Sequence, residues 1–187
     1  MSIDLSIDLE ESEVANIVAQ YHRYIDRLLL LQQQALVARE TELALGFMQL
    51  HRQMLSAHIE VEDQWLLSIA TEQQQAWRWP ASLYLAEHKK ITRFLTREEQ
   101  RLQSLAQRPT ATQVIALLDS QRSYKNLLEH HEEREEIALL KEISPLQQQQ
   151  LQQRVSERWR QLYQQQRQPL AELAQRLATV ETDIMTR

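Results

Sequence analysis

Six histidines and no cysteine define the metal chemistry that this chain can offer. The absence of thiols excludes disulfides, zinc fingers of the cysteine type and iron–sulfur clusters. A metal ion would have to be bound by imidazole nitrogens and carboxylate oxygens, a donor set that suits iron or manganese and also allows zinc. The candidate imidazoles are His22, His51, His58, His88, His130 and His131.

Two of the histidines are followed four residues later by a glutamate, in the pairs His58–Glu62 and His131–Glu135. On a helix this spacing places both side chains on one face, one turn apart. One such pair alone is more often a surface pair than a set of metal ligands. Two buried carboxylates would be costly unless cations neutralised them, so the pairs favour a metal site if they face the interior.

The sequence indicates that four of the six histidines do face one interior. Each lies on the apolar face of a different expected helix, and each is a similar number of residues from the same end of those helices. At the rise of an α-helix, all four fall roughly 12–20 Å from that end. We therefore predict one site at a single level of a bundle, with His22, His58, Glu62, His88, His131 and Glu135 as metal ligands.

The remaining polar residues are assigned to other places. His51 is two turns from His58, roughly 10 Å away, which predicts a role in the core or in a tunnel. His130 is turned about 100° from His131 and is expected to face a neighbouring helix or solvent. Glu87 is expected at the edge of the site, and the carboxylates expected on the solvated face are Glu60, Asp63, Glu132, Glu133 and Glu136. Tyr84 and Tyr124 are expected either to line the pocket or to pack in the core.

The composition predicts that helices position these residues. One glycine and four prolines leave few turn formers, whereas Leu, Gln, Glu, Ala and Arg favour helices. Breaks near 39–41 and at Pro80, Pro109, Pro145 and Pro169 divide the chain into helices over 11–37, 41–69, 80–107, 111–143, 146–167 and 169–186. The first four predict an all-α, up-down-up-down antiparallel four-helix bundle over residues 1–144. Residues 145–187 form a C-terminal helical extension, amphipathic enough to pack on the bundle or on a second copy.

Charge and hydropathy restrict the partners of the chain. The formal net charge of −5 gives no reason to expect nucleic acid. The longest apolar run, residues 28–31, is too short to span a bilayer, and the acidic first eight residues do not form a signal peptide. We therefore expect a cytoplasmic protein without a membrane or nucleic-acid partner.

With the residues arranged in this way, the chain resembles the hemerythrin-like, or HHE cation-binding, family across roughly residues 11–143. Individual motifs are short, but their order and spacing are specific, and the Glu-x-x-His tetrad of ferritin-like proteins does not occur. The matching motifs are Tyr21-His22-Arg23, His58-x-x-x-Glu62-Asp63, Glu87-His88-Lys89-Lys90-Ile91 and His131-x-x-x-Glu135-Glu136. The resemblance implies a non-haem centre of two iron ions of the Fe–O–Fe type, with Glu62 and Glu135 as bridges and the four histidines as terminal ligands.

The chain departs from that family's pattern at one position. Oxygen-carrying members have a further histidine four residues after the first one on the third helix, and Thr92 stands there. This departure favours sensing or handling of oxygen, nitric oxide, peroxide or iron over bulk oxygen carriage, with a small diatomic ligand or solvent at the metals. Two alternatives stay open: a di-iron redox enzyme of the peroxidase or oxidase kind, and a metal-stabilised interaction module whose C-terminal helices bind a second copy or another protein.

Overall fold

The computed structural model describes residues 13–70 and 77–185, and within these ranges it contains helices and no strand. The predicted all-α class is therefore confirmed. The expected helix ends at residues 11, 12 and 186 lie outside the described ranges. The elements are α1 (Val14–Val37), α2 (Thr41–Ala70), α3 (Ala81–Gln103), α4 (Ala111–Arg134), a π-helical segment η1 (Glu135–Leu139), the short α5 (Leu140–Glu142) and α6 (Pro145–Met185).

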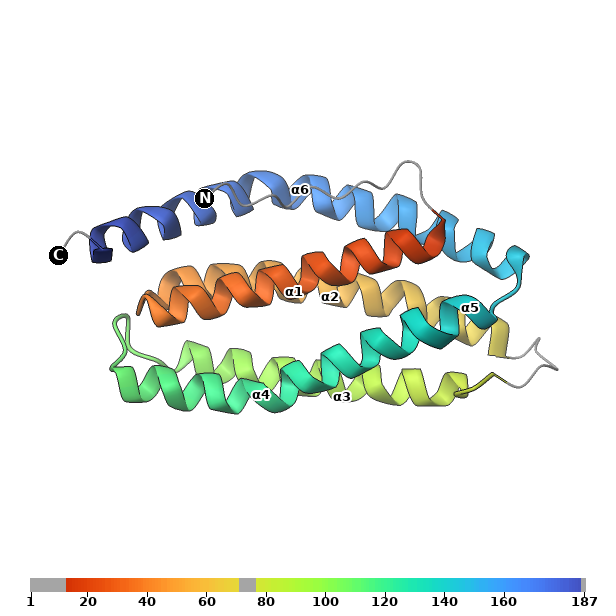
Figure 1. Cartoon of the computed structure of the whole chain (residues 1–187), viewed down its shortest axis with the longest axis horizontal. Helices are drawn as coiled ribbons and strands as arrows, with labels where there is room; N and C mark the ends of the chain where they lie inside the picture. The colour runs from red at the N-terminus through yellow and green to blue at the C-terminus, as the bar shows by residue number, and fades with distance from the viewer. Residues whose placement is uncertain (1–12, 71–76, 186–187) are drawn as a thin grey trace.

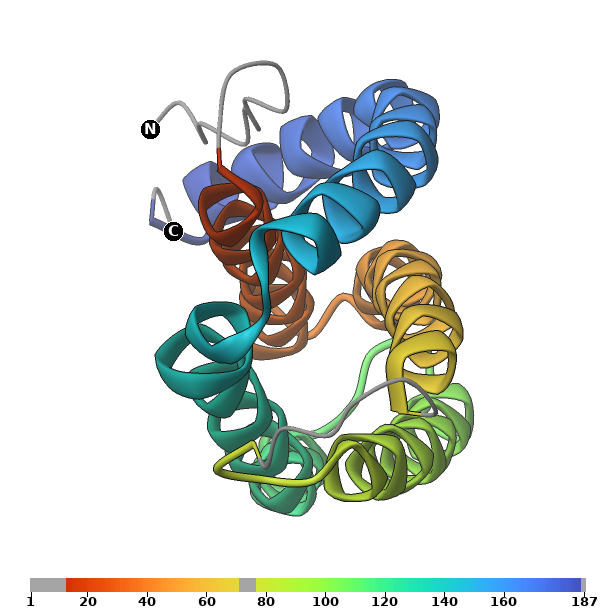
Figure 2. The ribbon, with the colours of Figure 1, turned by 90° about the vertical axis from the view of Figure 1, so that its right-hand side faces the viewer.

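The first four long helices form a helical bundle. In the end-on view of Figure 2, α1, α2, α3 and α4 surround a common interior, and each contacts the next, with α4 also contacting α1. The long α6 lies along the outside of α1 and α2, with which it is in contact (Figure 1). The C-terminal extension thus packs on helices of its own chain.

Short, specific contacts end one helix and begin the next. Arg39 has a positive φ of 63°, which turns the chain between α1 and α2 at the position expected from the sequence. Thr110 caps α4 in a reciprocal capping box with Gln113, as the sequence indicated. Ser144 and Gln147 exchange the same pair of hydrogen bonds, at 2.8 and 3.3 Å, where α6 begins. These caps satisfy backbone groups that a helix start leaves free.

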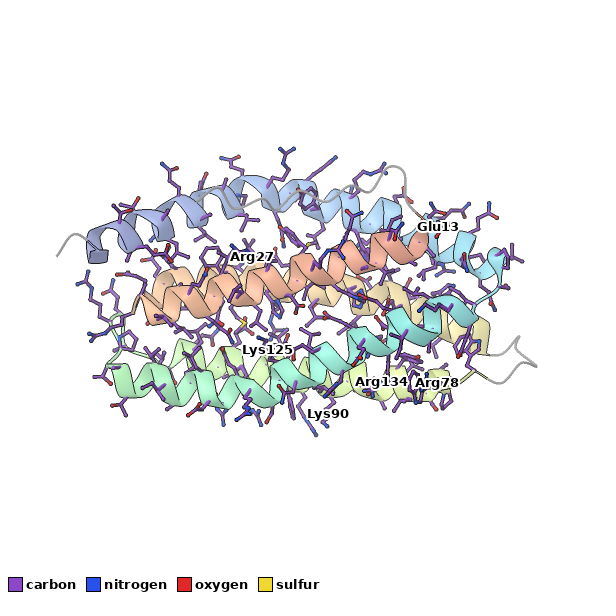
Figure 3. All side chains as sticks on the ribbon, in the orientation of Figure 1. Glu13, Arg27, Arg78, Lys90, Lys125 and Arg134 are labelled. Atoms are coloured by element: carbon purple, nitrogen blue, oxygen red, sulfur yellow. The ribbon has the colours of Figure 1, made fainter. Side chains whose placement is uncertain are left out.

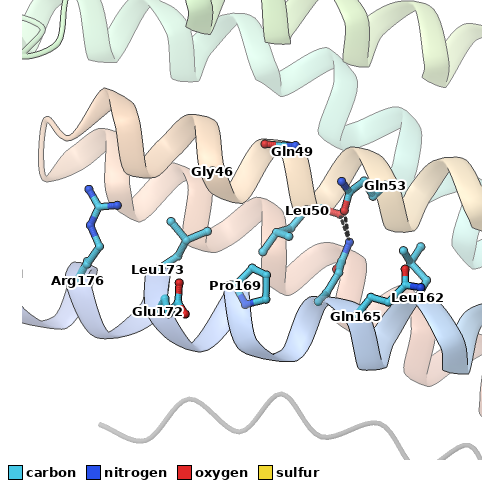
Figure 4. Close-up of a pocket in the computed structure, with 11 residues that line it drawn as sticks. Gly46, Gln49, Leu50, Gln53, Leu162, Gln165, Pro169, Glu172, Leu173 and Arg176 are labelled. Carbon is cyan, nitrogen blue, oxygen red and sulfur yellow. Dashed lines mark hydrogen bonds between the residues drawn. The ribbon is translucent and has the colours of Figure 1, made fainter.

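The boundary predicted at Pro169 is wrong, because α6 continues through it as one helix. Proline removes one backbone hydrogen bond from a helix interior, but the neighbouring turns are anchored on α2. The Gln166 side chain donates to the Leu50 carbonyl and to Gln53 Oε1 at 3.1 and 3.0 Å. Farther along, Leu173 packs against Gly46, where a Cβ would come within 2.8 Å of it (Figure 4). Tertiary packing therefore outweighs the local signal.

The single helix expected over 111–143 is also interrupted. Its hydrogen bonding changes to the π-helical pattern over Glu135–Leu139. The third helix is shorter than predicted, because it ends at Gln103 and not at 107. A π-segment inserts one residue into a helix and is frequent at functional sites. Here it begins at Glu135, one of the candidate ligands.

The interior is apolar apart from a small number of polar residues. Large fully buried side chains include Ile17, Ile25, Leu28, Phe47 and Trp159. Charged side chains such as Lys90 and Lys125 are exposed on the outer surfaces of the helices (Figure 3). Within the described residues, no helix is long and apolar enough to cross a membrane.

Candidate metal centre

The structure brings the six predicted site residues together inside the bundle. Each of the four long helices α1 to α4 contributes one histidine, α2 adds a glutamate, and η1 begins with the other glutamate. All six are buried, with at most 2% of their surface exposed. They are His22, His58, Glu62, His88, His131 and Glu135.

Glu135 lies at the centre of the cluster. Its Oε1 atom is 2.9 Å from Nε2 of His131 and 3.8 Å from Nε2 of His88. Its Oε2 atom is 3.1 Å from Nε2 of His22 and 3.6 Å from Nε2 of His58. The two oxygens therefore face two different pairs of histidines, an arrangement in which one carboxylate could bridge two ions.

Glu62 connects the same two pairs from α2. Its Oε2 atom is 3.2 Å from Nε2 of His58 and 3.5 Å from Nε2 of His88. Nε2 of His88 is also 2.9 Å from Nε2 of His131. Imidazole binds a first-row metal at about 2.1 Å, so two imidazoles at right angles on one ion have nitrogens about 3 Å apart. The separation between His88 and His131 fits that geometry.

Five of the six residues offer ligand atoms that all lie within 4.8 Å of one another, namely His58, Glu62, His88, His131 and Glu135. His22 stands outside this mutual set and is joined to it through Oε2 of Glu135.

Several atoms of the cluster are buried without a satisfied hydrogen bond. Within the described part of the chain, this holds for Nε2 of His22, both nitrogens of His58, Oε2 of Glu62 and both oxygens of Glu135. The contacts between them are short but lack hydrogen-bonding geometry. Leaving such atoms unpaired in a protein interior is costly. A cation among them would accept the lone pairs of the Nε2 atoms and of the carboxylate oxygens, so the residues present fit a bound metal.

Three of the four imidazoles have a carboxylate on Nδ1, the ring nitrogen that faces away from the cluster. The Nδ1 atoms of His22, His88 and His131 lie 2.9, 2.6 and 3.0 Å from Glu136, Asp63 and Glu87, respectively. Glu87 in turn accepts a hydrogen bond from Arg134. A carboxylate on the far nitrogen fixes the ring orientation and makes Nε2 a better ligand.

These contacts revise the expectations for the surrounding acids. Glu87 lies at the edge of the site, as expected, whereas Asp63 and Glu136 are only 35% and 41% exposed and bond to site histidines. Each directly follows a candidate glutamate ligand in the sequence, but that position does not show that a histidine of another helix approaches it. Glu132 was expected on the solvated face, which is wrong. It is buried, and burial raises its pKa to about 8.

The electrostatics of the cluster favour positive charge at the imidazoles. Burial alone lowers the pKa of His88, but the nearby carboxylates of Asp63, Glu135 and Glu62 outweigh burial and raise this pKa to about 11. The pKa of His131 rises to about 9, because the charge of Glu135 outweighs burial in the same way. Burial alone would raise the pKa of Glu135, yet the neighbouring histidines hold it well below the usual range.

The other two histidines lie outside the cluster. His51 is fully buried, and its Nδ1–H donates to the Ile25 carbonyl at 3.0 Å. Its Nε2 must then accept the Tyr124 hydroxyl, 2.5 Å away, which confirms a core role for His51. His130 is exposed on α4.

The remaining residues singled out from the sequence also have defined places. Tyr84 is buried, with its ring centre 6.2 Å from that of His131, so it lies beside the cluster. Thr92 is exposed and donates its hydroxyl to the His88 carbonyl at 2.9 Å, so it does not line the cluster.

Taken together, the geometry describes a buried cluster of imidazoles and carboxylates that could hold a metal ion. Compared with protein-family models, curated proteins and solved structures, the chain matches none of them. The donor types are those of iron, manganese and zinc sites in proteins.

Proposed function

We propose that this chain binds two metal ions, iron before manganese or zinc, as a non-haem dinuclear centre inside an up-down-up-down antiparallel four-helix bundle of the hemerythrin-like kind. Its role is to sense or handle oxygen, nitric oxide, peroxide or iron. One observation carries the proposal: four imidazole Nε2 atoms lie close to two buried carboxylates, and Oε2 of Glu62 and both oxygens of Glu135 lack hydrogen-bond partners within the described residues.

The proposal divides the donors between two subsites. The group formed by His88, His131 and Oε1 of Glu135 is called the His88 subsite. The His22 subsite is formed by His22, His58 and Oε2 of Glu135. Glu62 lies between the two subsites, because its Oε2 atom approaches both His58 and His88.

Charge supports two cations at this place. Two buried carboxylates lie in the cluster, and three more contact the imidazoles from outside. Neutral imidazoles would leave this negative charge uncompensated in a low-dielectric interior, which is unfavourable. Metal ions supply the compensation and, when bound, offer a Lewis-acidic and redox-active place for a small ligand.

The protein's own residues have separable tasks in this proposal. The bundle excludes water from the cluster, since all six candidate ligands are buried. Asp63, Glu87 and Glu136 keep the Nδ1 protons of His88, His131 and His22, which directs the unprotonated Nε2 atoms inward.

Metal analysis tests the proposal directly. Protein purified without chelators and loaded anaerobically with ferrous iron should contain about two metal ions per chain. His58→Ala and Glu135→Ala should lower that content, whereas His130→Ala, which alters an exposed histidine, should not. A chain that holds no transition metal after ferrous loading would exclude the proposed function. Unchanged content in both site variants would exclude the ligand assignment.

A further inference from the structure

The long helix α6 reaches the candidate metal centre through Trp159. Trp159 is fully buried, and its ring centre lies 5.3 Å from that of His58. It also stacks on Tyr21 of α1 at 3.9 Å, and Tyr21 stacks on His58 at 5.9 Å with the rings only 19° apart. The indole N–H of Trp159 donates to the Ala57 carbonyl at 3.4 Å, one residue before His58. His58 is thus packed against two aromatic rings.

His58 differs from the other three candidate imidazoles on its far side. Its Nδ1 atom has no hydrogen-bond partner among the residues that the structure describes, whereas the other three have a carboxylate there. A carboxylate partner normally sets the tautomer and orientation of a metal-binding histidine. Among the described residues, His58 instead has ring contacts with two side chains that are not candidate ligands, Tyr21 and Trp159.

We propose that Trp159 of α6 positions His58 for metal binding, so that α6 completes the His22 subsite, and that this subsite binds its ion more weakly than the His88 subsite. This inference rests on the proposed dinuclear centre.

The two subsites differ in how their imidazoles are supported. Both histidines of the His88 subsite have carboxylates on Nδ1, one of them fixed further by Arg134. In the His22 subsite only His22 has one. Because such partners increase the basicity of the imidazole, the His22 subsite has the poorer donors. The two ions should therefore bind in sequence, with the His88 subsite filled first.

Contacts elsewhere on α6 hold Trp159 in place. Gln166 donates to the Leu50 carbonyl and to Gln53, both on α2, and Arg176 pairs with Glu42 at 3.0 Å near the start of α2. These contacts fix the register of α6 against the helix that carries His58. Binding of the second ion should consequently depend on the docking of α6.

The test compares three variants of the full chain in anaerobic equilibrium dialysis against graded free ferrous iron. Trp159→Ala removes the ring, and Trp159→Phe keeps an aromatic ring against His58 and Tyr21. Leu177→Ala is the matched control, because Leu177 is buried on α6 but far along it from Trp159. Far-ultraviolet circular dichroism establishes that each variant is folded.

We expect two binding steps in the unmodified chain. In Trp159→Ala the first step should be unchanged and the second weakened about 10-fold or more, while Trp159→Phe should stay within about threefold of the unmodified chain. Leu177→Ala should keep both steps.

Three results would overturn the inference while leaving the proposed function standing. They are an unchanged second step in Trp159→Ala, equal losses in the Ala and Phe variants, or the same loss in Leu177→Ala. No iron bound by the unmodified chain would instead refute the proposed function itself.

Discussion

His51 makes the stability of this fold depend on pH in a way that can be calculated. Burial, aided by the charge of Arg52, lowers the pKa of His51 from 6.5 to about 4, although its hydrogen bond to the Ile25 carbonyl acts in the opposite direction. In the unfolded chain the same imidazole takes up a proton near pH 6.5. Between these two values protons bind to the unfolded chain and not to the folded one, so acid favours unfolding.

The size of the effect follows from the two pKa values. Above about pH 7.5 His51 is neutral in both states and contributes no pH dependence. With 1.36 kcal/mol for each pH unit, the folded state loses about 2 kcal/mol by pH 5 and about 3 kcal/mol by pH 4. That is a large share of the 5–15 kcal/mol that stabilises typical domains, as a rough guide.

Urea unfolding of the metal-free chain, followed by circular dichroism at several pH values, measures this loss. The reference is His51→Gln, whose side chain keeps a donor for the Ile25 carbonyl and an acceptor for the Tyr124 hydroxyl but does not titrate. The acid dependence of all other groups cancels in the comparison. The stability advantage of the unmodified chain should shrink by about 2 kcal/mol between pH 7.5 and 5. A difference that stays constant with pH would refute the reasoning.

Three further changes have defined outcomes. Asp63→Asn removes the carboxylate behind His88 and should weaken metal binding in equilibrium dialysis by about 10–100-fold. Glu60→Gln, on the exposed face of the same helix, should leave metal binding unchanged. Equal losses of metal affinity in the two variants would contradict the role of Asp63. Thr110→Ala removes a capping box and should cost about 1 kcal/mol in thermal unfolding, whereas Thr110→Ser should not. Pro169→Ala restores a backbone donor inside α6 and should raise stability by about 1–3 kcal/mol in urea. A lower urea midpoint would show that the proline is favourable where it stands.

Much of the fold could be read from local signals. Thr110 with Gln113, and Ser144 with Pro145 and Gln147, satisfy helix starts through neighbouring residues, so their effect does not depend on the rest of the molecule. Pro169 shows where local reasoning fails. The proline removes a backbone hydrogen bond within one turn of α6. The packing that compensates for this loss comes from α2, which is far away in the sequence.

The same division applies to the acids around the cluster. Asp63 and Glu136 had the sequence positions of solvated residues, and only the approach of His88 and His22 from other helices makes them bonding partners. The π-helical segment that begins at Glu135 could not be predicted either, because the hydrophobic periodicity of residues 135–139 does not distinguish a π-helix from an α-helix. Both depend on the distance between helices, which a pattern of residues along one helix does not contain.

The prediction that four histidines and two glutamates face one interior at one level needed no knowledge of how the helices pack. Helical periodicity sets the face of a side chain, and a constant rise per residue sets its height. Three features became visible only in the assembled fold. They are the division of the donors into two pairs about Glu135, the carboxylates that contact the Nδ1 atoms of the histidines, and the packing of Trp159 of α6 on His58. These are contacts between helices, and their geometry is set by packing distances and rotations that arise only when the helices assemble.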